Sequence, residues 1–150
     1  MARRFEFRLE TLLRVRQLRE REAKRKVAAQ RAEIARLDRL NRQTAEEISR
    51  QQAELLEDQR AGRVDPLTLQ RGRAWIGHLR RTIALRQVQR TEMLAQLQQL
   101  QGVWHAVRTQ ARVIEKLRER RWEQYVHERA RKEQAASDEL AQQLHSYDTT

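Results

Sequence analysis

The chain has 150 residues, a formal net charge of +11, 35% charged residues, 5% aromatic residues and no cysteine. The lack of cysteine excludes disulfides and thiolate chemistry, and no apolar stretch approaches the ~20 residues of a membrane-spanning helix. A mean hydropathy of −0.96 is compatible with disorder. The prevalence of Arg, Gln, Glu, Ala and Leu is instead typical of long helices. We therefore expect one cytoplasmic, helical domain.

The first predicted element is a helix from about residue 8 to residue 60. Residues at heptad spacing define its seam, and seven of these 14 positions are apolar. Asn41 occupies a seam position where a polar residue fixes register at a cost in stability. The predicted seam consists of Leu13, Arg16, Glu20, Ala23, Val27, Gln30, Ile34, Leu37, Asn41, Thr44, Ile48, Gln51, Leu55 and Asp58.

A single break follows at residues 61–65. Gly62 can end a helix by adopting a positive φ angle. Asp65 can cap the next helix, and Pro66, the one proline of the chain, suits a first helical position because it needs no N–H there. One stop and one start predict two helices joined by a short turn.

The second predicted helix runs from residue 66 to about residue 144 and is followed by a frayed end at 145–150. Its seam is more apolar than that of the first helix, since only Arg86 and Arg90 are polar among 12 positions. If the bend lies near Arg63, residue 9 faces about residue 117, and the second helix extends some 25 residues beyond the first. The predicted seam consists of Ile76, Leu79, Ile83, Arg86, Arg90, Met93, Leu97, Leu100, Trp104, Val107, Ala111 and Ile114.

The predicted fold is all-α: a long antiparallel two-helix coiled-coil hairpin whose second helix is the longer. Such a hairpin has no room for a buried catalytic pocket. The four histidines are 18 to 27 residues apart, too far for metal-ligand spacing on one helix face. We expect no enzymatic activity, no metal and no cofactor.

Basic residues are concentrated in two segments that the hairpin would place side by side. Residues 1–31 hold 11 basic and four acidic side chains, and residues 112–132 hold eight and four. The open end of the hairpin is therefore expected to be strongly basic and the bend nearly neutral. A basic end attracts an acidic partner: nucleic acid, an anionic membrane or an acidic protein surface. The simplest alternative is a solvated Arg-rich helix surface, and the interleaved glutamates disfavour nucleic acid.

Aromatic residues mark two further places. Trp75, Ile76 and Leu79 form an apolar patch near the bend, which packs against the first helix or anchors a partner. Trp122, Tyr125 and Val126 lie on the overhang of the second helix. We expect these three to pack against Phe5 and Phe7 or to be buried in a complex.

Two blocks of sequence resemble the flagellar export protein family FliJ. The first is residues 5–16, FEFRLETLLRVR, with two phenylalanines one residue apart followed by spaced leucines. The second is residues 115–125, EKLRERRWEQY, followed by Glu128, Arg131, Glu133, Gln134, Asp138 and Glu139. The order of the blocks and the hairpin between them strengthen the resemblance.

The resemblance implies a non-enzymatic stalk of the flagellar type III export apparatus, similar to the gamma stalk of rotary ATPases. It implies binding to the hexameric export ATPase, to the membrane export gate and to late-substrate chaperones, with peripheral association at the inner membrane. By position, Trp75, Ile76 and Leu79 correspond to a gate-binding patch. Charge and the analogy with rotary stalks assign the ATPase to the basic open end, with Arg14, Arg16, Arg118, Arg120 and Arg121. The alternatives are the equivalent stalk of a virulence secretion system and a basic coiled-coil nucleic-acid binder.

Overall fold

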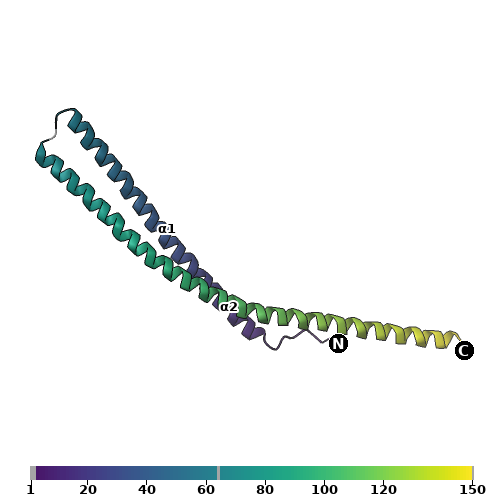
Figure 1. The fold of residues 1–150 in the computed structure, drawn as a ribbon. Coiled ribbons are helices and arrows are strands. Elements are labelled where there is room, and N and C mark those ends of the chain that lie inside the picture. Colours follow the sequence, from purple (N-terminus) through teal and green to yellow (C-terminus); the bar gives the residue numbers. More distant parts are fainter. Residues whose placement is uncertain (1–2, 64, 150) are drawn as a thin grey trace. The chain divides into compact units, whose positions relative to one another are not determined.

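The computed structural model describes residues 3–63 and 65–149, and these residues form two helices, α1 (Glu10–Arg60) and α2 (Pro66–Asp148). The helices contain 51 and 83 residues, and their contacts are those of an antiparallel hairpin, which confirms the predicted all-α fold (Figure 1). The contacts group into two compact units. The tip unit is residues 22–104, and the terminal unit combines the chain up to residue 21 with the chain from residue 105 onward. The single domain expected from the sequence stays a prediction.

The turn between the helices forms as its residues predict. Gly62 has a φ of 67°, and its N–H donates to the carbonyl of Gln59 while the N–H of Arg63 donates to that of Asp58. This pair of hydrogen bonds is the Schellman motif, in which a glycine in the left-handed region satisfies the last carbonyls of a helix. The turn therefore ends α1 at Arg60.

Asp65 caps the start of α2. Its Oδ1 accepts a hydrogen bond of 2.6 Å from the backbone N–H of Thr68, and Pro66 occupies the first helical position. The backbone and side-chain hydrogen bonds from Thr68 hold the pKa of the Asp65 carboxyl below its ordinary value. The ionised carboxylate also interacts favourably with the N-terminal end of the helix dipole.

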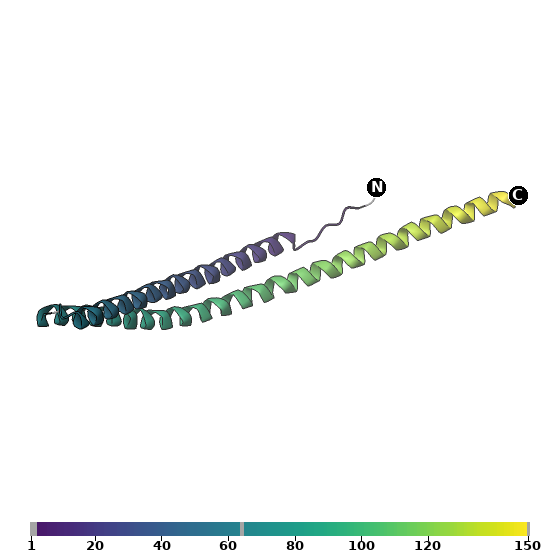
Figure 2. The ribbon, with the colours of Figure 1, turned by 90° about the horizontal axis from the view of Figure 1, so that it is seen from above.

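The core of the tip unit is a small apolar cluster between the two helices. Ile48 of α1 packs against Ile76 and Leu79 of α2, and Leu55 and Ile83 border this cluster. Within residues 22–104 the helices lie side by side in both ribbon views (Figures 1 and 2). Burial of these branched side chains supplies about 25 cal/mol per Å² of apolar surface removed from water.

Polar side chains fill the middle of the same seam. Arg86 Nη1 donates to Thr44 Oγ1 at 2.8 Å, and Arg90 Nε lies 2.8 Å from Asp38 Oδ1. The side-chain oxygen of Asn41 is buried with no hydrogen-bond partner among the described residues. An orphaned buried acceptor costs stability.

In the terminal unit, too, the residues of α1 and α2 pair in antiparallel order. Glu10 Oε2 lies 2.9 Å from Arg118 Nε, in agreement with the predicted register. Arg16 Nη1 donates to Gln110 Oε1 at 2.6 Å, and Leu13 is buried in the same unit. These cross-helix contacts lie within residues 10–21 and 105–118.

The helix boundaries differ from the sequence predictions at both ends. The helix α1 begins at Glu10 rather than near residue 8, because residues 3–7 are not helical and residues 8 and 9 form a turn. The helix α2 continues to Asp148, beyond the predicted end near residue 144, and fraying of residues 145–150 stays a prediction. Hydroxyl groups of Ser146 and Thr149 donate to carbonyls of the preceding turn, a local bonding pattern that a helix accommodates.

Candidate interaction surfaces

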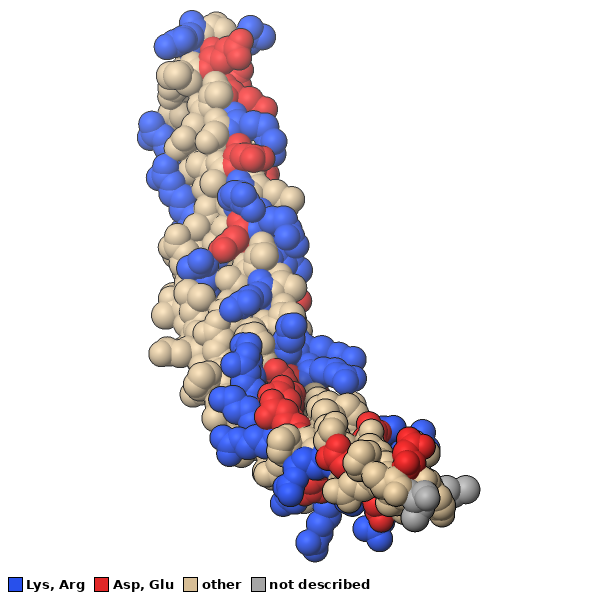
Figure 3. All heavy atoms as spheres, turned by 90° about the vertical axis from the view of Figure 1, so that its right-hand side faces the viewer, with Lys and Arg blue, Asp and Glu red and all other residues tan. Residues whose placement is uncertain are grey.

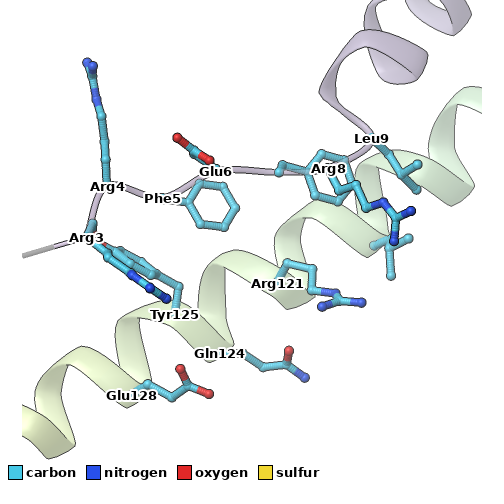
Figure 4. Close-up of a pocket in the computed structure, with 12 residues that line it drawn as sticks. Arg3, Arg4, Phe5, Glu6, Arg8, Leu9, Arg121, Gln124, Tyr125 and Glu128 are labelled. Carbon is cyan, nitrogen blue, oxygen red and sulfur yellow. The ribbon is translucent and has the colours of Figure 1, made fainter.

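The N-terminal segment, residues 3–9, is the most distinctive feature of the terminal unit. It passes alongside α2 beyond the start of α1, and Phe5 and Tyr125 lie between the two (Figure 4). The Tyr125 hydroxyl donates to the backbone carbonyl of Arg3 at 2.5 Å. The segment joins α1 through a hydrogen bond from the Glu10 N–H to the Phe7 carbonyl.

Phe5 is the anchor of this segment. Its ring meets Trp122 edge to face, with centroids 5.0 Å apart and an interplanar angle of 81°, and it lies 5.4 Å from the Tyr125 ring. The Arg118 guanidinium stands 5.8 Å from the centroid of the Phe5 ring. Aromatic pairs of this kind contribute about 0.5–1.5 kcal/mol each beyond area burial. Phe5 thus packs as the sequence suggests, whereas Val126 stays 46% exposed.

A groove of about 910 Å³ lies between the N-terminal segment and α2. Four of its lining side chains are cationic and two are carboxylates, so the groove is cationic overall. Arg4 points away from α2 in Figure 4, and Arg121 lies on the helix below the segment. The charged lining residues are Arg3, Arg4, Arg8, Arg121, Glu6 and Glu128.

The five arginines predicted to bind an ATPase fall into two groups. Arg16 and Arg118 are engaged across the helix pair, with Gln110 and Glu10 respectively. The remaining three, Arg14, Arg120 and Arg121, are exposed. An arginine that already holds the two helices together has less to offer a partner, so the exposed three are the better candidates.

Arg3, Arg4 and Arg8 were not singled out in the sequence. They line the groove because the N-terminal segment, although not helical, continues alongside α2 beyond the start of α1. Their only signal in the sequence was the high basic count of residues 1–31. With them, residues 3–21 and 105–132 hold 16 basic and seven acidic side chains.

The tip unit overlaps the basic N-terminal stretch of the sequence. It holds 16 basic and 10 acidic side chains, and residues 22–31 supply four of the basic and one of the acidic ones. A nearly neutral bend stays a prediction. The basic excess of α2 ends at Lys132, because residues 133–149 contain four acidic side chains and no lysine or arginine. Charges of both signs alternate over the face shown in Figure 3.

The three residues of the predicted gate-binding patch differ in their exposure to solvent. Ile76 and Leu79 are each 7% exposed and belong to the core cluster with Ile48. Trp75 is 44% exposed and stacks on His78, with ring centroids 5.4 Å apart. Only Trp75 of the three is available to a partner while α1 and α2 are packed.

The remaining predicted seam residues are all half-buried, and they divide between the two units. Ile83, Leu97, Leu100 and Trp104 are half-buried in the tip unit, and Val107 and Ile114 are half-buried in the terminal unit. These positions bring the helices together and leave the outer faces for partners.

Neither metal-site geometry nor a membrane span was found in the described residues. No group of three or more histidine and carboxylate side chains in residues 3–63 and 65–149 is arranged to hold a metal ion. No helix in this part of the chain combines the length and the apolarity that crossing a bilayer requires.

Comparison with known families identifies the chain. The family model described as flagellar FliJ protein matches residues 5–148, nearly the whole chain. No curated protein and no solved structure matches. The chain therefore belongs to the flagellar FliJ family, and it is a component of flagellar export.

Proposed function

We propose that this member of the FliJ family is a stalk-like protein that binds the hexameric flagellar export ATPase and promotes its assembly and activity. The observation that carries the proposal is the basic part of the terminal unit, where the N-terminal segment adds Arg3, Arg4 and Arg8 to the exposed arginines of both helices. A surface of this charge attracts an acidic protein surface and accelerates encounter with it.

Activation follows from a difference in affinity between two states of the ATPase. A stalk that touches several subunits at once binds an assembled ring more tightly than it binds a single subunit. By linkage, such a ligand shifts the equilibrium toward the ring. The protein then needs no catalytic residues of its own.

A second surface is proposed for the membrane export gate. Trp75 is the exposed member of the predicted patch, and tryptophan is favoured at binding hot spots. Contact with the gate would bring the protein to the inner membrane at the flagellar base without a membrane span. Binding of late-substrate chaperones rests on the family resemblance and has no assigned residues.

The ATPase contact is tested by reversing two exposed charges. The double variant Arg120→Glu with Arg121→Glu replaces two positive charges of the terminal unit by two negative ones and leaves the Glu10–Arg118 pair unchanged. Its affinity for the purified cognate ATPase should fall at least about tenfold, equal to ~1.4 kcal/mol, in titration calorimetry.

The matched control is Arg80→Glu with Arg81→Glu, an exposed arginine pair of the tip unit. It makes the same change in net charge and should leave ATPase affinity within about twofold of the parent. Equal losses for both variants would show that net charge alone, and not this surface, governs binding.

A further inference from the structure

A groove of about 550 Å³ lies between α1 and α2 next to the turn, and we call it the tip groove. Its floor is apolar, because side chains from the edge of the core cluster line it together with Leu56, which is 50% exposed. A concave site with exposed apolar surface is suited to bind an apolar side chain of a partner. The apolar lining residues are Leu55, Leu56, Leu69 and Ile76.

Both charged side chains that line the tip groove are cationic. Arg73 and Arg80 are exposed and lie seven residues apart, which is ~10.5 Å along α2. The surrounding part of α2, residues 66–91, contains six arginines and no carboxylate. Carboxylates of the neighbouring part of α1 do not line the groove, since the helical rotation directs them at least about 100° away from Leu56: Glu54, Glu57 and Asp58.

The C-terminal stretch of α2, residues 138–148, has the complementary character. Every residue of it is exposed, and Leu140, Leu144 and Tyr147 share one side of the helix because they are four and three residues apart. The stretch contains three carboxylates and no lysine or arginine. The pocket that Arg3 of the N-terminal segment forms with α2 reaches only as far as Ala136, so the C-terminal stretch begins beyond it.

We propose that the tip groove of one copy of the chain binds the C-terminal stretch of a second copy. Charge complementarity supports this choice of occupant, because the charged lining of the groove is +2 and the stretch carries −3. The helix α2 is uninterrupted from Pro66 to Asp148, so the stretch that occupies a groove comes from another copy.

The two surfaces also match in length. Leu140 and Tyr147 are seven residues apart, which is the same ~10.5 Å that separates Arg73 from Arg80 along α2. With Leu140 and Leu144 packed against the floor of the groove, a carboxylate lies on each flank of the bound helix. One of the two faces the arginine side of the groove in either direction of binding: Glu139 and Asp148.

The association is expected to be weak and reversible. The contact is smaller than the interfaces of stable complexes, so a dissociation constant on the order of 10–100 μM is expected. Each copy uses two different surfaces, and contacts of this kind build rings or open chains. Repulsion between copies of net charge +11 is largely screened beyond about 8 Å at physiological salt, whereas the contacting pairs lie within that distance.

The inference is independent of the proposed ATPase contact. Neither the N-terminal segment nor the exposed arginines of the terminal unit line the tip groove, and Trp75 does not line it either. Failure of one proposal therefore leaves the other unaffected.

Sedimentation equilibrium of the full chain between about 10 and 300 μM at physiological salt measures the association. Arg73→Glu places a carboxylate beside the bound carboxylates and should weaken the association at least about tenfold. Arg71→Glu is the matched control, because it makes the same change in charge about 200° around the helix, outside the groove lining, and should stay within about twofold of the parent. Equal losses in both variants would overturn the proposal.

Mixing two variants tests the identity of both surfaces. Arg73→Glu with Arg80→Glu disables the groove, and Leu140→Gln with Leu144→Gln disables the stretch while glutamine keeps a high helix propensity. Neither variant should associate alone, and circular dichroism checks that both keep the helix content of the parent. An equimolar mixture should regain association, because the first variant supplies an intact stretch and the second an intact groove. A mixture that stays monomeric, or a parent chain that is monomeric at about 300 μM, would contradict the proposal.

Discussion

At the scale of single residues, the cap at Asp65 gives the turn a dependence on pH. The Thr68 hydrogen bonds lower the pKa of the Asp65 carboxyl in the folded state below its ordinary value. A group with a depressed folded pKa stabilises the fold above its unfolded pKa, and this contribution is lost as pH falls through the folded pKa. The cap therefore stabilises the turn fully at neutral pH and weakens below about pH 4.

The variant Asp65→Asn tests the direction of this pH dependence of stability. Asparagine keeps the capping acceptor but does not titrate, so the variant should lose less stability than the parent chain when the pH drops below about 4. Thermal unfolding followed by circular dichroism at neutral and acidic pH measures the difference. An identical decrease in both proteins would mean that the Asp65 carboxylate does not contribute.

Phe5 is the second residue whose role is local and measurable. Phe5→Ala removes the ring that covers Trp122 and Tyr125, so the Trp122 indole should become more exposed and its fluorescence emission should shift to longer wavelength. The loss of two aromatic contacts should destabilise the N-terminal segment by about 1–3 kcal/mol. The measurement is made with Trp75→Phe and Trp104→Phe in the background, so that only Trp122 emits.

Phe5→Leu is the control for this prediction, since leucine keeps most of the apolar volume and should give a smaller shift. Unchanged emission in Phe5→Ala would show that the N-terminal segment does not cover Trp122 in solution.

At the scale of elements, the glycines of α2 differ in what surrounds them. A Cβ atom at Gly72 would lie 2.8 Å from the Leu55 side chain, whereas a Cβ atom at Gly102 would meet nothing within 4 Å. Gly102→Ala should therefore gain the full difference in helix propensity, about 1 kcal/mol. Gly72→Ala should gain less, because Leu55 has to move.

Urea denaturation of both variants measures this difference in the free energy of unfolding. A lower stability of Gly102→Ala than of the parent chain would contradict the prediction, and would indicate that the outer face of α2 is covered at residue 102.

The elements also show what a sequence of this kind can predict. Heptad spacing and the Gly62, Asp65 and Pro66 signals are local, and the turn and the antiparallel register followed from them. Residues 3–9 have no periodicity, so their course alongside α2 depends on tertiary contacts of Phe5 that no local pattern encodes.

The candidate site was harder to predict than the fold. Trp75 and Ile76 are adjacent in the chain, yet only Ile76 lies on the seam and is buried, so a patch chosen by apolar character mixed a core residue with a surface residue. Similarly, Arg118 and Arg120 look alike in the sequence, but Arg118 pairs with Glu10. Placing each residue on its helix face separates binding candidates from packing residues.

At the scale of the whole molecule, the proposed role rests on family membership and on charge. The chain is a flagellar export component of the FliJ family, and its two helices are joined by a tightly capped turn. The terminal unit combines a cationic groove, exposed arginines and, beyond Lys132, an acidic apolar stretch. These surfaces suit binding to other proteins, and we propose that the basic part binds the export ATPase.

The most direct test of that claim is the rate of ATP hydrolysis by the purified cognate export ATPase, titrated with this protein at saturating ATP. The account predicts that the rate and the hexamer fraction rise together. It also predicts that Arg120→Glu with Arg121→Glu shifts the half-maximal concentration upward at least about tenfold. A rate that stays unchanged at every concentration of the parent protein would contradict the account.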